Sequence, residues 1–207
     1  MKVKICGIKD VETALYAISQ GADALGFLFA ESKRRITPED AKEIIDKLPD
    51  KILKVGVFVN EEVENIKRIV EYTGLTAVQL HGDEPPETCE AFSIPVIKAL
   101  SVGSSDDLEK IHEYDCEYVL LDSPKGKYRG GNGVKFDWSL LAEFNTNGKK
   151  VILAGGLNEA NVTEAIRMSQ PFMVDVSSGV ETDGKKDKLK IHNFIDEAKS
   201  AQREEVK

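Results

Sequence analysis

The sequence predicts a single (β/α)₈ barrel, an α/β fold in which eight parallel strands close into a ring inside a layer of helices. Short apolar runs alternate with longer amphipathic segments from one end of the 207-residue chain to the other. Several of the eight runs are nearly continuous in β-branched or bulky residues, as in strands covered on both faces. One barrel typically needs roughly 200–250 residues, so we expect residues 1–207 to form one domain.

The expected strands are the apolar runs themselves. Right-handed crossovers between eight β–α units close naturally into a barrel. An open doubly wound sheet is the rival fold, and it usually carries a G-x-G-x-x-G turn after its first strand. This chain has Gly7-Ile8-Lys9 there, which favours the barrel. The strands are expected at residues 3–6, 22–29, 54–59, 77–82, 95–100, 118–122, 151–156 and 172–176.

Capping residues mark the helices expected between these strands. Polar residues that favour helix N-termini precede four amphipathic stretches, and glycine or proline ends three of them. Weaker helical segments are expected at 86–92 and 136–143, and the last helix at 187–201. The N-terminal caps are Asp10, Thr37, Asn60 and Asn158, and the stops are Gly21, Gly74 and Pro171.

Composition and charge narrow the class of protein. Hydrophobic residues make up 41% of the chain and charged residues 31%, ordinary values for a globular protein with a buried core. The net charge of −8 comes with basic residues dispersed among acidic ones, so no basic face for nucleic acid is expected. A small anion remains a suitable ligand, because backbone amides bind phosphate without net positive charge.

Cysteine usage and the N-terminal sequence bear on location. Three cysteines, Cys6, Cys89 and Cys116, are an odd number that suits a reducing compartment better than a disulfide framework. The chain shows neither a basic-then-apolar leader nor an apolar run of about 18 residues. We therefore expect a cytoplasmic protein that does not bind membranes. Monomer and homodimer both remain open.

In a barrel the active site lies at the C-terminal ends of the strands. Polar residues stand at the ends of several otherwise apolar runs, where they are costly unless they are paired or used. These candidates are Cys6, Gln79, His81, Lys98, Asp122 and Asp175.

Two glycine-rich loops favour a phosphate site. Barrels often bind phosphate with the loops after strands 7 and 8. Here those loops read AGGLN at 154–158 and VSSGVE at 176–181. Their backbone amides and serine hydroxyls could donate to phosphate oxygens, although both loops could also be plain turns. The residues concerned are Gly155, Gly156, Ser177, Ser178 and Gly179.

Cys6 and Asp122 are the candidates for acid–base chemistry. A lone cysteine is usually a small buried hydrophobe, and Cys89 and Cys116 are interpreted so. Cys6 ends the run VKIC and is expected to face the pocket. Its thiolate could act there as base or nucleophile, if the site lowers the pKa of the thiol from ~8.5 toward neutrality. Asp122 could be a general acid or could merely cap a turn. The loop 123–133 after it could close over a ligand.

Two lysines raise further possibilities. Lys98 at a strand end could form a Schiff base with a carbonyl substrate, as in a lysine-dependent aldolase. Alternation alone does not show whether it points into the barrel. Lys4 shares a face with Cys6, and we expect it to pair inside the barrel with an acidic residue such as Asp175, because strand 8 closes against strand 1.

Nine stretches together resemble one family of tryptophan biosynthesis, the phosphoribosylanthranilate isomerases. The resemblance runs from Lys4 to about Asp187, and KICG at the first strand with VQLHG at the fourth is quite specific. The stretches are KICGI, GADALGFLF, SKRRITPEDA, KVGVFVNE, AVQLHGDE, LLDS, GGNGVKFDW, AGGLN and VDVSSGVE.

The resemblance implies an activity, with N-(5-phosphoribosyl)anthranilate as the small-molecule substrate. The family carries out an Amadori rearrangement to 1-(2-carboxyphenylamino)-1-deoxyribulose 5-phosphate, without a cofactor or metal. Asp122 is then the general acid that protonates the furanose ring oxygen, and Cys6 the general base that removes the C2 proton.

The resemblance also implies the binding residues. Arg34 in SKRRI would meet the anthranilate carboxylate, for which a guanidinium fork is suited, and Arg35 would be solvated. The pocket would be lined by Gln79, His81 and Asp175, and the phosphate would rest on Gly155, Gly156, Ser177, Ser178 and Gly179.

Other functions remain as alternatives. The histidine-pathway ribosylamine isomerases perform the same chemistry, but that family has aspartate where this chain has Cys6. Indole-glycerol phosphate synthase would need a longer N-terminal segment, and a lysine-dependent aldolase rests on Lys98 alone. A non-catalytic sensor of phosphate ligands would have no use for a base–acid pair such as Cys6 and Asp122.

Overall fold

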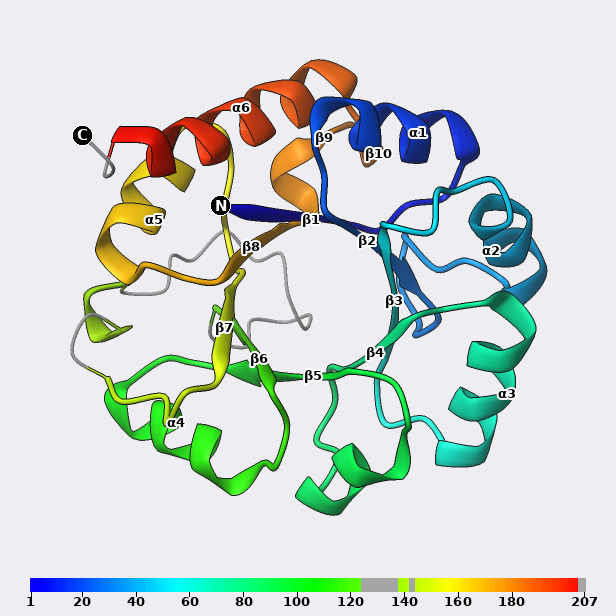
Figure 1. The fold of residues 1–207 in the computed structure, drawn as a ribbon, viewed down its shortest axis with the longest axis horizontal. Coiled ribbons are helices and arrows are strands. Elements are labelled where there is room, and N and C mark those ends of the chain that lie inside the picture. Colours follow the sequence, from blue (N-terminus) through cyan, green and yellow to red (C-terminus); the bar gives the residue numbers. More distant parts are fainter. Residues whose placement is uncertain (124–137, 142–143, 205–207) are drawn as a thin grey trace.

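Eight parallel strands form a closed ring in which each strand pairs with its sequence neighbours and β8 pairs with β1 (Figure 1). The computed structural model describes residues 1–123, 138–141 and 144–204. The predicted barrel is confirmed. Its strands are β1 (Lys2–Cys6), β2 (Ala24–Leu28), β3 (Leu53–Phe58), β4 (Ala77–Leu80), β5 (Val96–Ser101), β6 (Tyr118–Asp122), β7 (Lys150–Leu153) and β8 (Met173–Val176).

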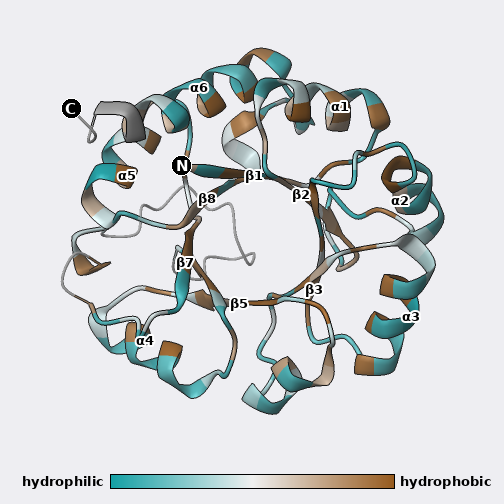
Figure 2. Ribbon diagram, viewed as in Figure 1, coloured by the Kyte–Doolittle hydropathy of each residue, from teal (hydrophilic) through white to brown (hydrophobic). Residues whose placement is uncertain are grey.

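Helical segments surround the ring on its outside (Figure 1). The strands are predominantly hydrophobic, whereas the helices mix hydrophobic and hydrophilic residues (Figure 2). The α-helices are α1 (Val11–Gln20), α2 (Pro38–Ile45), α3 (Val63–Thr73), α4 (Ser105–Glu109), α5 (Val162–Ser169) and α6 (Lys188–Glu204). Short 3-10 helices cover Pro86–Ala91, Lys110–Glu113, Trp138–Leu141 and Ser178–Val180.

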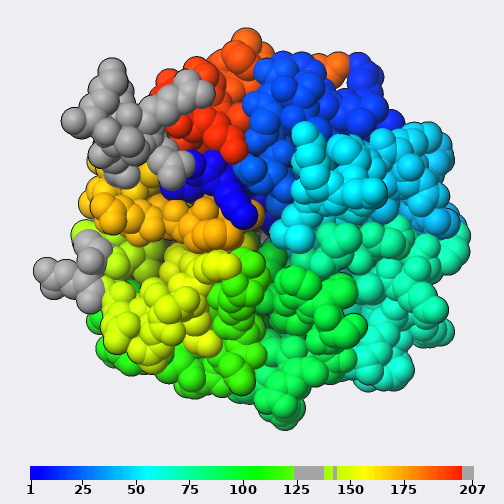
Figure 3. Space-filling view, in the orientation of Figure 1, coloured from blue at the N-terminus to red at the C-terminus, as the bar shows by residue number. Residues whose placement is uncertain are grey.

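Period-2 alternation divides the apolar residues between two cores. One set, including Ala24, Val55 and Leu120, fills the inside of the ring. The other set, including Ile5 and Phe27, packs beneath the helices. The inner residues are almost wholly buried, so the inside of the ring is a packed core, around which the elements lie close together (Figure 3).

The seam between β1 and β8 contains a buried ion pair. Lys4 is opposite Asp175 in the parallel register, and its Nζ lies 2.9 Å from Asp175 Oδ1. The Lys4 side chain has no exposed surface. The pairing expected from the sequence is therefore confirmed.

Two helix starts differ from the predictions. The cap of α3 is Glu62, because Asn60 has a left-handed backbone (φ 50°) and its side chain accepts a hydrogen bond from the Asp83 amide. The cap of α5 is Asn161, because Asn158 first forms a turn in which its N–H donates to Asn161 Oδ1. In both cases the asparagine binds loop backbone and the helix begins later.

The two weaker helical segments form 3-10 helices in the residues that the structure describes. Residues 86–92 form the 3-10 helix Pro86–Ala91. Of 136–143, the structure describes only Trp138–Leu141, also a 3-10 helix. The suggested covering loop at 123–133 lies outside the described residues after Ser123.

A hairpin after β8 was not predicted. The 3-10 helix Ser178–Val180 leads into β9 (Glu181–Thr182), which pairs antiparallel with β10 (Lys185–Lys186). Its turn is Asp183-Gly184, and both residues have positive φ. Asp-Gly is a strong sequence signal for such a two-residue turn, so the hairpin could have been found.

Lys98 does not point into the barrel. Its neighbours Ile97 and Ala99 belong to the inner core, so alternation turns Lys98 outward. There Lys98 Nζ lies 2.6 Å from Glu84 Oε2 and 2.9 Å from the Gly82 carbonyl oxygen, almost wholly buried. Lys98 is therefore a structural cation, and the strand-end candidate that could have formed a Schiff base does not face the inside of the ring.

In the described part of the chain, no helix combines the length and the apolar character that crossing a membrane requires.

We predict that Lys98→Met lowers the free energy of unfolding by about 3–5 kcal/mol, because Glu84 would remain buried without its cation. The double variant Lys98→Met/Glu84→Gln should recover a large part of that loss. Lys42→Met is the matched control, since Lys42 forms an exposed pair with Asp46 and should change stability by less than about 0.5 kcal/mol. Urea unfolding measures all three. A Lys98→Met variant as stable as the control would contradict the structural role.

Candidate active site

Cys6 stands at the last position of β1, on the inward face of the ring. Its register partner is Gly26 of β2, two residues beyond Ala24 of the inner core. A Cβ on Gly26 would lie 2.7 Å from Cys6 Sγ, closer than atoms can approach. The glycine in β2 therefore makes room for the thiol.

Opposing charges act on the Cys6 thiol. Burial raises its pKa, the cations of Lys4 and Lys186 lower it, and the carboxylate of Asp175 raises it. The net effect is a pKa above the ordinary value of a thiol. The lowering toward neutrality that would make the resting thiol a thiolate is therefore not found in this structure, and the free thiol is protonated at neutral pH.

Asp122 ends β6 on the same inward face and at the same end of the ring as Cys6. It lies two residues beyond Leu120 of the inner core and is almost wholly buried. Asp122 Oδ1 accepts a hydrogen bond of 2.8 Å from the Ser123 amide. Asp122 is on β6 and Cys6 is on β1, and the two strands between them on the shorter path round the ring are β7 and β8.

His81 and Gln79 connect to Asp122. Gln79 Nε2 lies 2.8 Å from His81 Nδ1, and His81 Nε2 lies 3.4 Å from Asp122 Oδ2. When the Gln79 amide donates to Nδ1, the imidazole proton sits on Nε2 and points at Asp122. Two of the predicted pocket residues and the candidate acid therefore meet in one chain of contacts.

Two buried oxygens beside this chain lack hydrogen-bond partners among the described residues. They are Gln79 Oε1 and Ser123 Oγ. A buried polar atom without a partner is costly, and such atoms are concentrated where ligands bind.

Arg34 crosses the end of β1 from the loop after β2. A Cβ on Gly7 would lie 2.8 Å from Arg34 Cδ and 3.3 Å from Ser177 Oγ, so the arginine stem rests against the glycine. Gly7 also has a φ of +82°, which side chains rarely adopt. Arg34 is half-buried, whereas Arg35 is exposed as predicted.

The two glycine-rich loops lie at the same end of the ring. Gly155 and Gly156 have positive φ. A Cβ on Gly155 would lie 2.9 Å from Asp122 Oδ1, so this loop adjoins the acidic residue. Ser178 and Gly179 open the 3-10 helix after β8, and the first N–H groups of a helix have no partner within it. The Ser177 hydroxyl instead donates to the Cys6 carbonyl oxygen at 3.1 Å.

Glu181 and Lys186 also lie in the site, and the sequence reasoning missed both. Arg34 forms two hydrogen bonds to Glu181, and Lys186 Nζ lies 2.8 Å from Glu181 Oε1. Both residues belong to the hairpin after β8, whose Asp-Gly turn was the available signal. Within the described ranges, no group of three or more His, Cys, Asp or Glu side chains is arranged to hold a metal ion.

Comparison with known proteins assigns the family. A sequence profile described as N-(5'phosphoribosyl)anthranilate (PRA) isomerase matches residues 3–197. The chain belongs to the phosphoribosylanthranilate isomerase family. It is therefore an isomerase of tryptophan biosynthesis, and the resemblance seen in the sequence is confirmed.

Individual phosphoribosylanthranilate isomerases agree along nearly the whole chain. A protein of this name from Bacillus mycoides (strain KBAB4) is 60% identical over 200 residues, which are 96% of this chain and 98% of the relative. The crystal structure of the Thermotoga maritima enzyme has a TM-score of 0.90 and 47% identity, covering 97% of this chain and 99% of that chain. A structure in complex with reduced 1-(o-carboxyphenylamino)-1-deoxyribulose 5-phosphate has a TM-score of 0.87 and 46% identity, with the same coverage.

We predict that Gly7→Ala destabilises this isomerase more than Gly184→Ala. Both positions have positive φ, so each variant carries a backbone cost of roughly 1–2 kcal/mol. Only Gly7 adds a clash with Arg34, because a Cβ at Gly184 meets nothing within 4 Å. Unfolding in denaturant compares the two. Equal losses in the free energy of unfolding for the two variants would show that Arg34 does not rest on Gly7.

We predict that the Cys6 thiol titrates above its ordinary pKa. The ultraviolet absorbance of the thiolate, taken as wild type minus Cys6→Ser, isolates this group. Lys186→Met should move the midpoint to still higher pH, because Lys186 favours the thiolate. Lys185→Met, in the same hairpin, is the matched control and should not move it. A Cys6 midpoint below neutral pH would contradict the structure.

Proposed function

We propose that this isomerase catalyses the Amadori rearrangement of N-(5-phosphoribosyl)anthranilate with Asp122 as general acid and Cys6 as general base. The observation that carries the proposal is the placement of both groups on the inward face at the same end of the ring, where barrel enzymes have their active sites. The substrate would bind between them.

The first step opens the sugar ring. The protonated Asp122 carboxyl gives its proton to the furanose ring oxygen, and the bond between that oxygen and C1 breaks. The nitrogen lone pair forms a C1=N double bond, which leaves an iminium ion and a hydroxyl at C4. The Asp122 carboxylate that results is within reach of His81 Nε2, at 3.4 Å.

The second step removes the proton from C2. Once the iminium charge is present, the Cys6 thiol loses its proton to solvent. The resulting thiolate takes the C2 proton, and the C2–H electrons form a C1=C2 double bond while the iminium nitrogen recovers its lone pair. The enolamine then tautomerises, as the C2 hydroxyl loses its proton and C1 gains one, to give the ketone. Asp122 regains a proton from solvent, which restores the starting states of both residues.

The charges around Cys6 support its assignment as base. The thiol is protonated in the free protein because it is buried, but Lys4 and Lys186 supply positive charge beside it. The iminium ion adds another positive charge and makes the C2 proton acidic. The thiolate is therefore favoured at the stage of the reaction that needs it.

The ends of the substrate would be held by charges and amides. The phosphate would rest on the amides of Gly155, Gly156, Ser178 and Gly179, with Ser177 holding that loop to β1 through its hydroxyl. The anthranilate carboxylate would meet the guanidinium of Arg34. The compound bound in one relative carries both a carboxyphenyl group and a phosphate, which supports two anionic subsites here.

The pocket polar groups would orient the sugar. Gln79 Oε1 is buried without a partner among the described residues, and substrate hydroxyls could supply one. Asp175 is held by Lys4 at the seam and would line the pocket beneath Cys6.

The alternative functions have less support. A lysine-dependent aldolase would need Lys98 in the pocket, and Lys98 lies outside the ring with Glu84. A sensor would not need the buried acid beside His81.

Location and partners remain predictions. We propose a cytoplasmic enzyme that acts on a small molecule and binds no nucleic acid. The Thermotoga maritima relative is described as dimeric, which makes a homodimer a reasonable expectation for this chain. One assay tests the proposed activity: the purified protein should abolish the fluorescence of phosphoribosylanthranilate.

We predict that Cys6→Ser and Asp122→Asn each lower kcat by roughly 10²-fold or more, the scale of a positioned base or acid. The same fluorescence assay measures both. Cys89→Ser and Asp106→Asn are the matched controls, since Cys89 is buried in the outer core and Asp106 is exposed in α4. Near-normal turnover in Cys6→Ser or Asp122→Asn would remove that residue from its role.

A further inference from the structure

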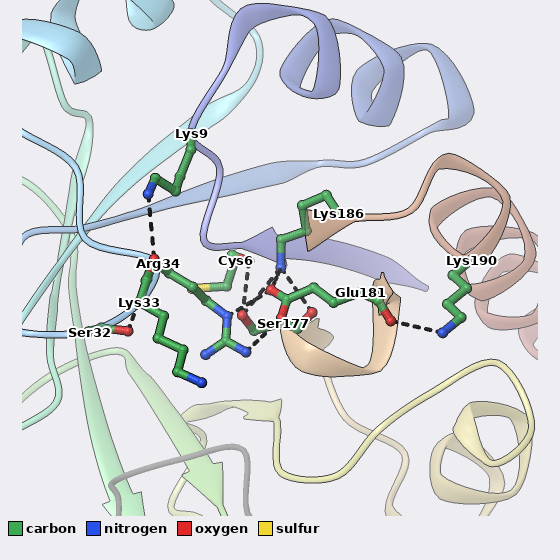
Figure 4. A network of polar contacts seen from close by, with 9 residues as sticks. All are labelled: Cys6, Lys9, Ser32, Lys33, Arg34, Ser177, Glu181, Lys186 and Lys190. Atoms are coloured by element: carbon green, nitrogen blue, oxygen red, sulfur yellow. Dashed lines mark hydrogen bonds and ion pairs between the residues drawn. The ribbon is translucent and has the colours of Figure 1, made fainter. Parts of the chain in front are cut away.

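Arg34 is held by a carboxylate that comes from the far end of the sequence. Arg34 Nε lies 2.7 Å from Glu181 Oε1, and Arg34 Nη2 lies 2.7 Å from Glu181 Oε2. Figure 4 shows the guanidinium and the carboxylate facing one another beside Cys6. Two parallel charge-assisted hydrogen bonds fix the plane of the guanidinium as well as its position.

Glu181 is itself anchored at both its side chain and its backbone. Lys186 Nζ donates to Glu181 Oε1 at 2.8 Å and to the Ser177 carbonyl oxygen at 2.9 Å. Lys190 Nζ, from α6, donates to the Glu181 carbonyl oxygen at 2.8 Å (Figure 4). The carboxylate is thus a fixed support on which the Arg34 side chain rests.

The cluster is charged and nearly dry. The side chains of Glu181 and Lys186 are each 7% exposed, and that of Arg34 is 27% exposed. Burial alone would raise the pKa of Glu181, but the two cations lower it to about 2. Glu181 is therefore ionised at all working pH values. One carboxylate between two cations leaves a net charge of +1, which favours an additional anion.

The geometry leaves one edge of Arg34 for that anion. Glu181 uses Nε–H and one N–H of Nη2, which together form one side of the planar fork. The other edge, made of Nη1 and the second N–H of Nη2, faces away from Glu181 and matches a second carboxylate. A flexible arginine would lose rotamer entropy on binding, and one already held loses less.

We propose that Glu181 is a positioning residue that orients Arg34 to receive the carboxylate of the substrate. Glu181 acts through Arg34 and does not touch the reacting atoms. The inference rests on the proposed function for the identity of the substrate. The opposite view is that Glu181 competes with the substrate carboxylate for Arg34, and the two views predict opposite effects of removing it.

The kinetic test uses a double-mutant cycle of Glu181→Ala, Arg34→Ala and both together. Glu181→Ala should raise KM about tenfold with kcat changed less than about twofold, because the contact orients a binding group. The double variant should have the KM of Arg34→Ala alone, since Glu181 has no effect without Arg34. Glu181→Asp keeps the negative charge, and its KM should lie between those of wild type and Glu181→Ala. Lys185→Ala, exposed on the same hairpin, is the matched control and should behave as wild type.

A binding test separates this inference from the proposed function. The probes are reduced 1-(o-carboxyphenylamino)-1-deoxyribulose 5-phosphate and the same compound without its carboxyl group. Glu181→Ala and Glu181→Gln should weaken binding of the probe that has the carboxyl group about tenfold. Binding of the probe without it should be unchanged. Glu181→Gln keeps nearly the same shape, so this comparison stands even if the alanine variant does not fold.

Three outcomes would overturn the proposal. They are equal weakening of both probes, tighter binding of the carboxylate probe in Glu181→Gln, and additive losses in the double-mutant cycle. If the wild-type protein did not isomerise phosphoribosylanthranilate, the proposed function would fail while the difference between the two probes would still test Glu181.

Discussion

Closure of the ring between β1 and β8 is the constraint on which the site depends. At this seam Lys4 and Asp175 bury opposite charges 2.9 Å apart, and neither would be tolerated inside without the other. Burial by itself lowers the pKa of Lys4, but the carboxylate of Asp175 and the neighbouring Cys6 raise it above its ordinary value. Lys4 is therefore a permanent cation beneath the thiol. In an open sheet β1 would lie at an edge, Lys4 would lose its partner Asp175, and Cys6 would have no wall opposite.

Two glycines shape the surroundings of Cys6. Gly26 on β2 leaves space for the thiol inside the ring, and Gly7 leaves space above β1 for the Arg34 stem. The backbone thus passes close to both side chains, so Cys6 and Arg34 fit side by side without displacing one another. This explains why KICG ends in glycine: the residue after Cys6 must adopt a positive φ and carry no side chain.

The electrostatics of the site divide into two regions. Around Cys6, the cations of Lys4 and Lys186 partly offset a burial that favours the neutral thiol. Around Asp122, the contacts are a backbone amide and the imidazole of His81. The first region therefore carries positive charge beside a buried thiol, and the second holds a carboxyl against an imidazole. The proposed reaction, which passes through an iminium ion, would use both regions.

Local patterns in the sequence determined the strands and the ends at which chemistry could occur. Apolar runs that end in Cys6 and Asp122 are local features. Because the C-terminal ends of all the strands of a barrel lie at the same end of the ring, both residues are then expected there. Local pattern did not decide which face of β5 carries Lys98, because alternation gives two faces without saying which is inside. It also misplaced the caps of α3 and α5, because the side chains of Asn60 and Asn158 accept hydrogen bonds from the loop amides of Asp83 and Ala160 instead. Only the tertiary structure brought Glu181 to Arg34, 147 positions away, because that contact exists only when the ring closes and β8 lies beside β1.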